Sequence, residues 1–186
     1  MSLTIPEIVD RYLDKMIKVE LNYITGEVVP AMRGKDNGEG WTEWIPIPST
    51  VTESELAELE QRIGYPLPDA YKLFLQYKFF YELMIDNVSF NNHIAGSWQE
   101  GLLDLVLHSY PKEWFVDKGY IPFANYDDWG LLCFDAGKQQ TPESSGTNYA
   151  VCLWDHEKPQ QFKWLYPDFL TLMQDLDKRD EESSSD

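Results

Sequence analysis

The chain has 186 residues, which suits one domain of roughly 100–200 residues, and 43% of them are apolar. This apolar fraction excludes a disordered protein, and no apolar run approaches the ~20 residues needed to span a bilayer. The formal net charge of −17 at pH 7 disfavours direct binding to nucleic acid or to an anionic membrane, because phosphate contacts require a basic surface.

Five segments are expected to form helices, and three of them begin with the spacing of a capping box. In that spacing a hydroxyl residue and a glutamate three positions later bond each other's backbone amides. The three pairs are Thr4 with Glu7, Thr52 with Glu55, and Ser97 with Glu100. The helix after Thr52 is expected to end at Gly64, and the next begins at Asp69, beyond two prolines. A last helix is expected from near Pro167.

The segments between the expected helices have the apolar and β-branched patterns of strands. Residues 81–93 predict two short strands separated by polar turns. Four consecutive strands joined by turns are expected further on, at residues 120–124, 131–135, 149–154 and 161–165. Trp41 and Trp44 lie in a Gly-rich stretch that predicts a short hairpin or an extended arm.

These elements predict a single α+β domain, with a mostly antiparallel sheet of about six strands surrounded by helices. We expect residues 1–50 to form an N-terminal helix and an extended arm packed on the domain, and residues 51–176 to form the domain itself. Residues 177–186 are expected to be a disordered acidic tail. The start of the sequence shows no signal peptide, which predicts a cytoplasmic location.

The two cysteines, Cys133 and Cys152, lie among apolar residues of two predicted strands. Two cysteines are too few for a disulfide framework, so the pattern favours small core residues in a reducing compartment. One redox-responsive bridge is the alternative, and it requires that the two strands are neighbours in the sheet.

One stretch of the main domain resembles the SUKH superfamily of Smi/Knr-type proteins. It has an acidic amphipathic helix at residues 55–63, then Gly-Tyr-Pro-Leu-Pro at 64–68, then Tyr-Lys-Leu-Phe-Leu at 71–75. Two later blocks are similar to the family's central hairpin and last strands: residues 120–135, which include Trp129-Gly130, and residues 149–156, followed by Phe169-Leu170. The resemblance extends from about Val51 to Leu176, and the first fifty residues have no counterpart in it.

The resemblance implies a sheet wrapped by helices and a role as a binding module. Members are known as yeast cell-wall regulators and as bacterial immunity proteins, many of which neutralise a secreted toxin that is often a nuclease. An acidic chain suits such a partner, because nucleases tend to be basic where they hold phosphate and opposite potentials speed association. We therefore expect a non-catalytic immunity protein that binds a basic toxin domain and needs no cofactor. The alternative is a regulatory scaffold that binds a housekeeping protein.

The turn Asp127-Asp128-Trp129 is the first candidate for the contact surface. Its carboxylates would pair with a partner's Lys or Arg, and tryptophan is a preferred anchor of interface energy. The alternative is an ordinary hairpin turn, with solvated aspartates and a tryptophan folded onto the sheet.

Three further acidic residues at strand ends are expected to share a rim with that turn: Asp135, Asp155 and Glu157. Together with His156 they allow three interpretations, namely a solvated rim, a partner contact and a metal-dependent enzyme site. The sequence contains no metal-binding spacing such as His-Glu-x-x-His, so neither a metal ligand nor a catalytic residue is predicted.

Overall fold

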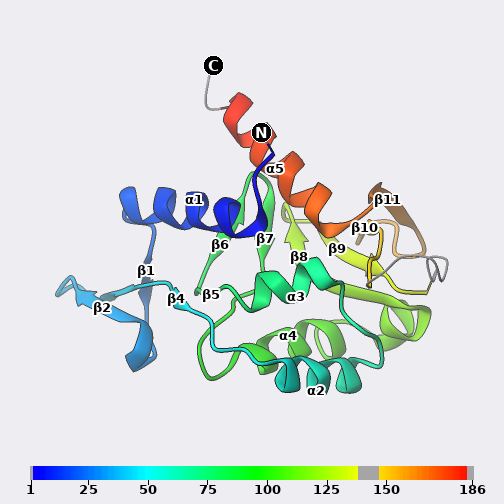
Figure 1. Ribbon diagram of the computed structural model, residues 1–186, viewed down its shortest axis with the longest axis horizontal. Coiled ribbons are helices and arrows are strands. Elements are labelled where there is room, and N and C mark those ends of the chain that lie inside the picture. Colours follow the sequence, from blue (N-terminus) through cyan, green and yellow to red (C-terminus); the bar gives the residue numbers. More distant parts are fainter. Residues whose placement is uncertain (1, 138–146, 184–186) are drawn as a thin grey trace.

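The computed structural model describes residues 2–137 and 147–183, and Figure 1 shows the arrangement of its elements. The helices are α1 (Ile5–Lys18), α2 (Glu53–Ile63), α3 (Asp69–Leu75), α4 (Trp98–Leu107) and α5 (Phe169–Ser183), with 3-10 turns η1 (Pro30–Met32), η2 (Lys112–Trp114) and η3 (Val116–Lys118). The strands are β1 (Tyr23–Thr25), β2 (Arg33–Asp36), β3 (Trp41–Trp44), β4 (Ile47–Pro48), β5 (Lys78–Phe79), β6 (Leu83–Ile85), β7 (Val88–Phe90), β8 (Tyr120–Tyr126), β9 (Gly130–Asp135), β10 (Val151–Asp155) and β11 (Phe162–Tyr166).

A six-stranded sheet forms the centre of the molecule, in the order β11-β10-β9-β8-β7-β6. Each neighbouring pair is antiparallel, and α4 lies in the chain between the adjacent strands β7 and β8. Two small sheets, β1-β3-β2 and β4-β5, accompany it. The α+β domain with about six antiparallel strands that the sequence predicted is therefore confirmed.

Local sequence explains where the helices begin and end. Thr4 and Thr52 each form the complete predicted capping box, and Gly64 ends α2 in the left-handed conformation, with φ of 88°. The capping box predicted at Ser97 is wrong, because that side chain makes no cap hydrogen bond. The backbone of Ser97 has ψ of 10°, whereas an N-cap residue that bonds the helix is typically extended.

The central strands are buried on both faces of the sheet. On one face Phe169 of α5 lies among four rings, whose centroids are 5.2 Å, 5.5 Å, 5.7 Å and 6.0 Å from its own: Tyr71, Phe74, Phe123 and Phe134. These spacings and the steep angles between the rings are favourable for aromatic pairs. Phe169 therefore anchors the start of α5 on the sheet, and Leu172, Met173 and Leu176 continue the buried face of the helix.

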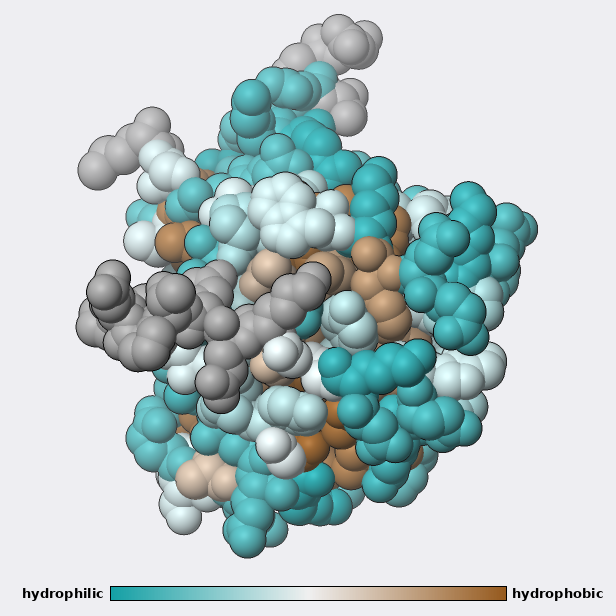
Figure 2. Space-filling view, turned by 90° about the vertical axis from the view of Figure 1, so that its right-hand side faces the viewer, coloured by the Kyte–Doolittle hydropathy of each residue, from teal (hydrophilic) through white to brown (hydrophobic). Residues whose placement is uncertain are grey.

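On the opposite face α4 contacts β8, and the η2–η3 segment places Phe115 against Trp154 of β10 at 5.0 Å. The surface near β11 is mostly hydrophilic, with a narrower apolar strip between the polar side chains (Figure 2). Among the described residues, no helix combines the length and the apolar character needed to cross a membrane.

The helix α1 is part of the same core as the main domain. It buries Ile8, Val9 and Leu13, and it contacts α5, α3 and β6. Its Asp10 accepts hydrogen bonds from Tyr77 and from Lys78, both at 2.6 Å. The small sheet β1-β3-β2 lies beside the end of α1, at one end of the molecule (Figure 1).

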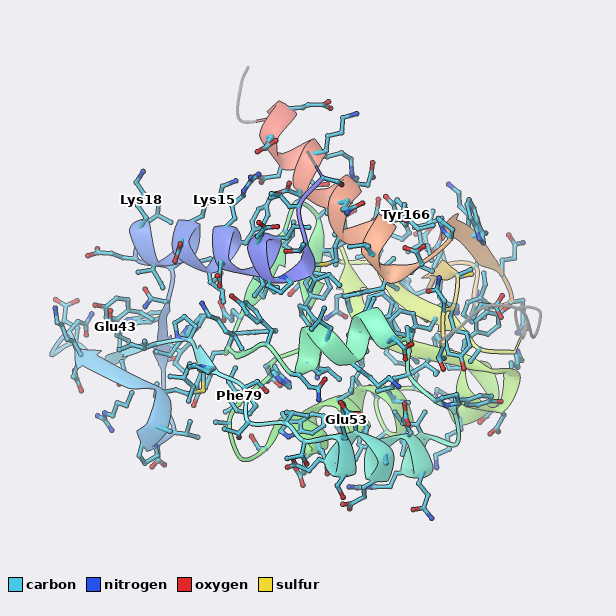
Figure 3. All side chains as sticks on the ribbon, viewed as in Figure 1. Lys15, Lys18, Glu43, Glu53, Phe79 and Tyr166 are labelled. Atoms are coloured by element: carbon cyan, nitrogen blue, oxygen red, sulfur yellow. The ribbon has the colours of Figure 1, made fainter. Side chains whose placement is uncertain are left out.

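The helix α5 continues to Ser183, so the disordered tail expected from residue 177 is wrong for residues 177–183. The carboxylate of Asp177 is 3.0 Å from the guanidinium of Arg11, and Lys15 pairs with Asp180. Lys15 extends outward from α1, as Figure 3 shows. The acidic composition was misleading because these acids have basic partners on another helix. Residues 184–186 lie outside the described residues.

Cys133 and Cys152 are direct partners across β9 and β10, and both are buried thiols that are not joined to each other. Burial raises the pKa of the Cys133 thiol, and the neighbouring Cys152 adds to that effect. The neighbouring strands required for a bridge are therefore present, while the burial fits the role of small core residues.

Candidate functional site

The turn between β8 and β9 is fixed by contacts with a second turn, the one between β6 and β7. Asp127 has φ of 47°, a left-handed conformation that aspartate tolerates better than most residues. Its amide donates to the carbonyl of Asn87 at 2.9 Å, and the amide group of Asn87 donates to its carboxylate at 3.3 Å. The orientation of the Asp127-Asp128-Trp129 turn is thus set by the neighbouring hairpin.

The turn after β10 lies against the turn between β8 and β9. Asp155 is the strand partner of Gly130, and a side chain at Gly130 would lie 2.9 Å from Leu153 Cδ1. The Nδ1 atom of His156 is 2.7 Å from the carbonyl oxygen of Trp129. Because a carbonyl oxygen only accepts, Nδ1 carries the hydrogen. This bond holds the two turns together.

We call the surface formed by residues 127–129 and 155–157 the hairpin rim. Asp127, Asp128 and Glu157 are exposed, and Asp155 is half-buried and accepts from the amide of Glu157 at 2.8 Å. The structure therefore brings together five of the six residues predicted as a site from the sequence. Trp129 is 38% exposed, and its ring meets that of Tyr126 edge-on at 5.5 Å.

Asp135 does not belong to the hairpin rim, and its prediction as a surface contact is wrong. It is only 5% exposed and lies at the far end of β9 from Gly130, about 17 Å away at the rise of a β-strand. Because β9 and β10 are antiparallel, this end of β9 meets the start of β10. The sequence marked Asp135 as a strand end, but strand direction decides which ends meet.

A polar cavity of about 360 Å³ adjoins the hairpin rim. Its floor includes Ser89 and Asn125, which are partners across β7 and β8, and its wall includes Tyr110 and Trp154. Sequence reasoning missed Ser89, Asn125 and Tyr110 as residues of the site. The only signal that could have identified the first two is the strand register, which short strands do not reveal.

The charge of the hairpin rim differs on the two sides of Trp129. Asp127 and Asp128 lie on one side, whereas Lys158 and Lys163 line a hollow of about 270 Å³ with Asp155 on the other. Within residues 2–137 and 147–183, no three His, Cys, Asp or Glu side chains are grouped so that they could hold a metal ion. The arrangement suits contact with cationic side chains at Asp127 and Asp128.

The fold and this surface define a class of protein, namely a single α+β domain in which helices wrap an antiparallel sheet and hairpin turns form a partly acidic rim. Comparison with protein families gives a match to the SMI1 / KNR4 family (SUKH-1) over residues 50–175. The match covers more than half of the chain, so the chain belongs to this family. A search of curated proteins found no match.

Proposed function

We propose that this chain is a non-catalytic immunity protein, which neutralises a toxic protein by binding a basic surface of it with the hairpin rim. The observation that supports this proposal is the convergence of two turns from separate hairpins, which places exposed carboxylates around a half-exposed tryptophan. Family membership favours a protein-binding role over other roles for this surface.

The proposed partner carries Lys or Arg residues at its functional surface, as a nuclease does where it holds phosphate. Opposite potentials raise the association rate, towards about 10⁸–10⁹ M⁻¹s⁻¹ at low salt in favourable cases. The net charge of −17 supplies the attraction at long range, and the hairpin rim supplies the contact. Trp129 supplies apolar area beside the charges, the combination found in interface hot spots.

The test is a pull-down with the tagged chain from the source organism's lysate at low salt, followed by a salt ramp and mass spectrometry. The double variant Asp127→Lys with Asp128→Lys is compared with a control, Glu58→Lys with Asp117→Lys, which changes exposed acids elsewhere and shifts the net charge equally. A basic protein retained by the wild type and the control, but about ten- to a hundredfold weaker on the rim variant, is the expected result.

Function is then measured by co-expression, in which the wild-type chain should suppress the toxicity of the recovered protein and the rim variant should not. Equal binding by both charge variants would refute the hairpin rim as the contact surface. A recovered housekeeping protein without toxicity would instead favour the alternative role, a regulatory scaffold in the manner of the Smi/Knr-type regulators.

A further inference from the structure

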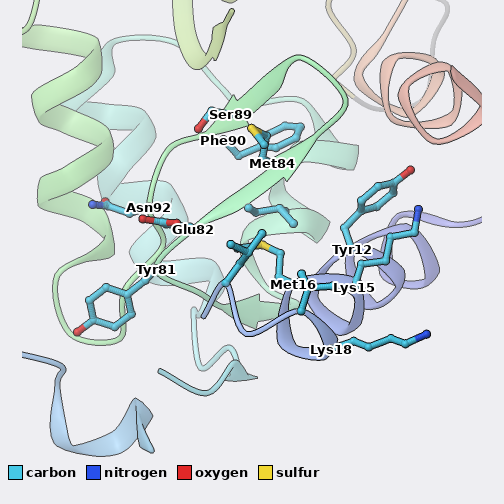
Figure 4. A pocket seen from close by; sticks show the side chains of 13 residues that line it. Tyr12, Lys15, Met16, Lys18, Tyr81, Glu82, Met84, Ser89, Phe90 and Asn92 are labelled. Atoms are coloured by element: carbon cyan, nitrogen blue, oxygen red, sulfur yellow. The ribbon is translucent and has the colours of Figure 1, made fainter. Parts of the chain in front are cut away.

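An apolar groove of about 890 Å³ is lined by residues of α1, of the turn after it and of the β6–β7 hairpin. From α1 and the turn after it come Met16, Val19 and Leu21, and from the hairpin come Leu83 and Met84. Figure 4 shows Met16 on α1 and Met84 on β6, beside Ser89 and Phe90, among the side chains that line the groove. The groove is the larger of the two hollows beside this hairpin, since the polar cavity next to it is about 360 Å³.

The exposure of Met84 follows from its place in the sheet. Strand β6 is an edge strand, and its residues alternate between a buried face with Leu83 and Ile85 and an open face with Met84. The helix α4 has its main strand contact with β8, and Met84 on β6 is 60% exposed. Val19 and Leu21 on the opposite wall are also exposed, at 62% and 58%. Such a gathering of exposed apolar side chains marks an interaction surface.

The groove is continuous with the cavity beside the hairpin rim. Met84 pairs with Ser89, and Ser89 pairs with Asn125, so the three side chains form one row on the same face of the sheet. Ser89 lines both the groove and the polar cavity. Two strand spacings separate Met84 from Asn125, about 10 Å in all. A typical interface of ~800 Å² per partner is roughly 30 Å across, so one partner can cover both hollows.

The charges around the groove restrict the kind of partner that fits. Glu82 is exposed on the wall formed by the hairpin, and Lys15 on the opposite wall is neutralised by Asp180. Exposed Lys18, at the end of α1, also lines the groove, so a basic protein cannot extend its charged groups toward this wall. The hairpin side of the groove, where Glu82 lies, therefore fits a basic surface that also reaches the hairpin rim, and the space toward α1 fits an uncharged, projecting side chain.

We infer that the groove is the apolar anchor site for the same basic protein partner, which inserts an apolar side chain flanked by Lys or Arg beside Met84. This inference rests on the proposed function and adds to it the place where apolar contact is made. In this arrangement the charged rim governs association, and the desolvated groove governs how long the complex lasts.

The kinetic consequences of the two contacts differ. Met84→Asp is expected to accelerate dissociation about tenfold or more, with little change in association rate or in salt dependence. Asp128→Lys is expected to slow association and to weaken its dependence on salt. A Met84→Leu variant, which keeps an apolar side chain, should behave as the wild type. Surface plasmon resonance at two salt concentrations with the recovered partner measures all three.

The contact itself is tested by photo-crosslinking in the source organism's lysate, with p-benzoylphenylalanine placed singly at position 84, 128 or 164. Trp164 is the matched control, because it is 59% exposed on the opposite edge strand β11. The expected result is that positions 84 and 128 label the same basic protein, and that position 84 labels an apolar residue of it next to Lys or Arg. Position 164 should not label it.

Labelling from position 128 without labelling from position 84 would overturn the anchor site and leave the proposed function standing. Labelling of different proteins from the two positions would also overturn it, since it requires one partner across both hollows. An absence of labelling from both positions would remove the proposed function together with the anchor site.

Discussion

The buried histidine His93 provides a direct test of how closely the core is packed. It is 2% exposed, and its Nε2 atom is 2.7 Å from the carbonyl oxygen of Leu75, so Nε2 carries the hydrogen. The rings of Phe79 and Trp98 lie 4.9 Å and 5.5 Å from it. Burial among these groups lowers the pKa of His93 from 6.5 to about 4, although the bond to Leu75 acts in the opposite direction.

The sign of the effect on stability follows from this lowered pKa. Between pH 6.5 and about pH 4 the unfolded chain binds a proton at His93 and the folded chain does not. The contribution of buried, neutral His93 to the free energy of unfolding is therefore complete above pH 6.5, and it is lost progressively as the pH falls towards 4. At pH 5.0 the pH lies about 1.5 units below the pKa of His93 in the unfolded chain. Protonation then stabilises the unfolded state and lowers the free energy of unfolding by about 2 kcal/mol.

The assay is urea unfolding at pH 7.5 and pH 5.0 for the wild type and for His93→Gln, whose side-chain amide can donate to Leu75 but does not titrate. The loss of unfolding free energy between the two pH values should be about 2 kcal/mol larger in the wild type. Contributions from carboxylates cancel in this comparison. His108→Gln, at an exposed position, should follow the wild type. Equal losses in the wild type and His93→Gln would show that His93 titrates normally in the folded chain, which refutes the reasoning.

Three further predictions concern the core and the hairpin rim. Phe169→Ala removes the ring at the centre of the aromatic cluster and should lower the free energy of unfolding by about 3–5 kcal/mol in urea titration, whereas Leu170→Ala, at a 38% exposed position, should cost less than about 1 kcal/mol. Cys133 should not react with Ellman's reagent in the folded chain and should react on unfolding; rapid labelling of the folded chain would contradict its burial. Gly130→Ala places a methyl group against β10 and should lower the free energy of unfolding by about 1–3 kcal/mol, and an unchanged melting temperature would argue against that close approach.

Much of the fold could be predicted because its signals are local. The capping boxes at Thr4 and Thr52 involve atoms three residues apart, and the left-handed cap at Gly64 depends on one residue. The exception at Ser97 shows the limit of this reasoning, because the spacing is present but the backbone has ψ of 10° and the hydroxyl makes no cap hydrogen bond. The hairpin meander was likewise visible as short turns between apolar runs.

The candidate site was predictable only in part, for a different reason. Asp127 and Trp129 are adjacent in sequence and share a turn, so their proximity required no knowledge of the sheet. Asp135 was placed with them because it ends a strand, and the antiparallel direction of that strand carries it to the other end. Met84 offered no signal, since an apolar residue in a strand is expected to be buried unless the strand lies uncovered at an edge.

The sequence by itself determined the family, the order and type of the elements, the negative charge and the composition of the turns, because each of these resides in the residues or in their near neighbours. Tertiary structure alone decided which strand ends meet, that the acidic residues after Leu176 continue a helix beside Arg11, and that Met84 faces an open groove. These properties depend on contacts between segments far apart in the chain. A charge or an apolar side chain has no fixed role until the packing places a partner, or solvent, beside it.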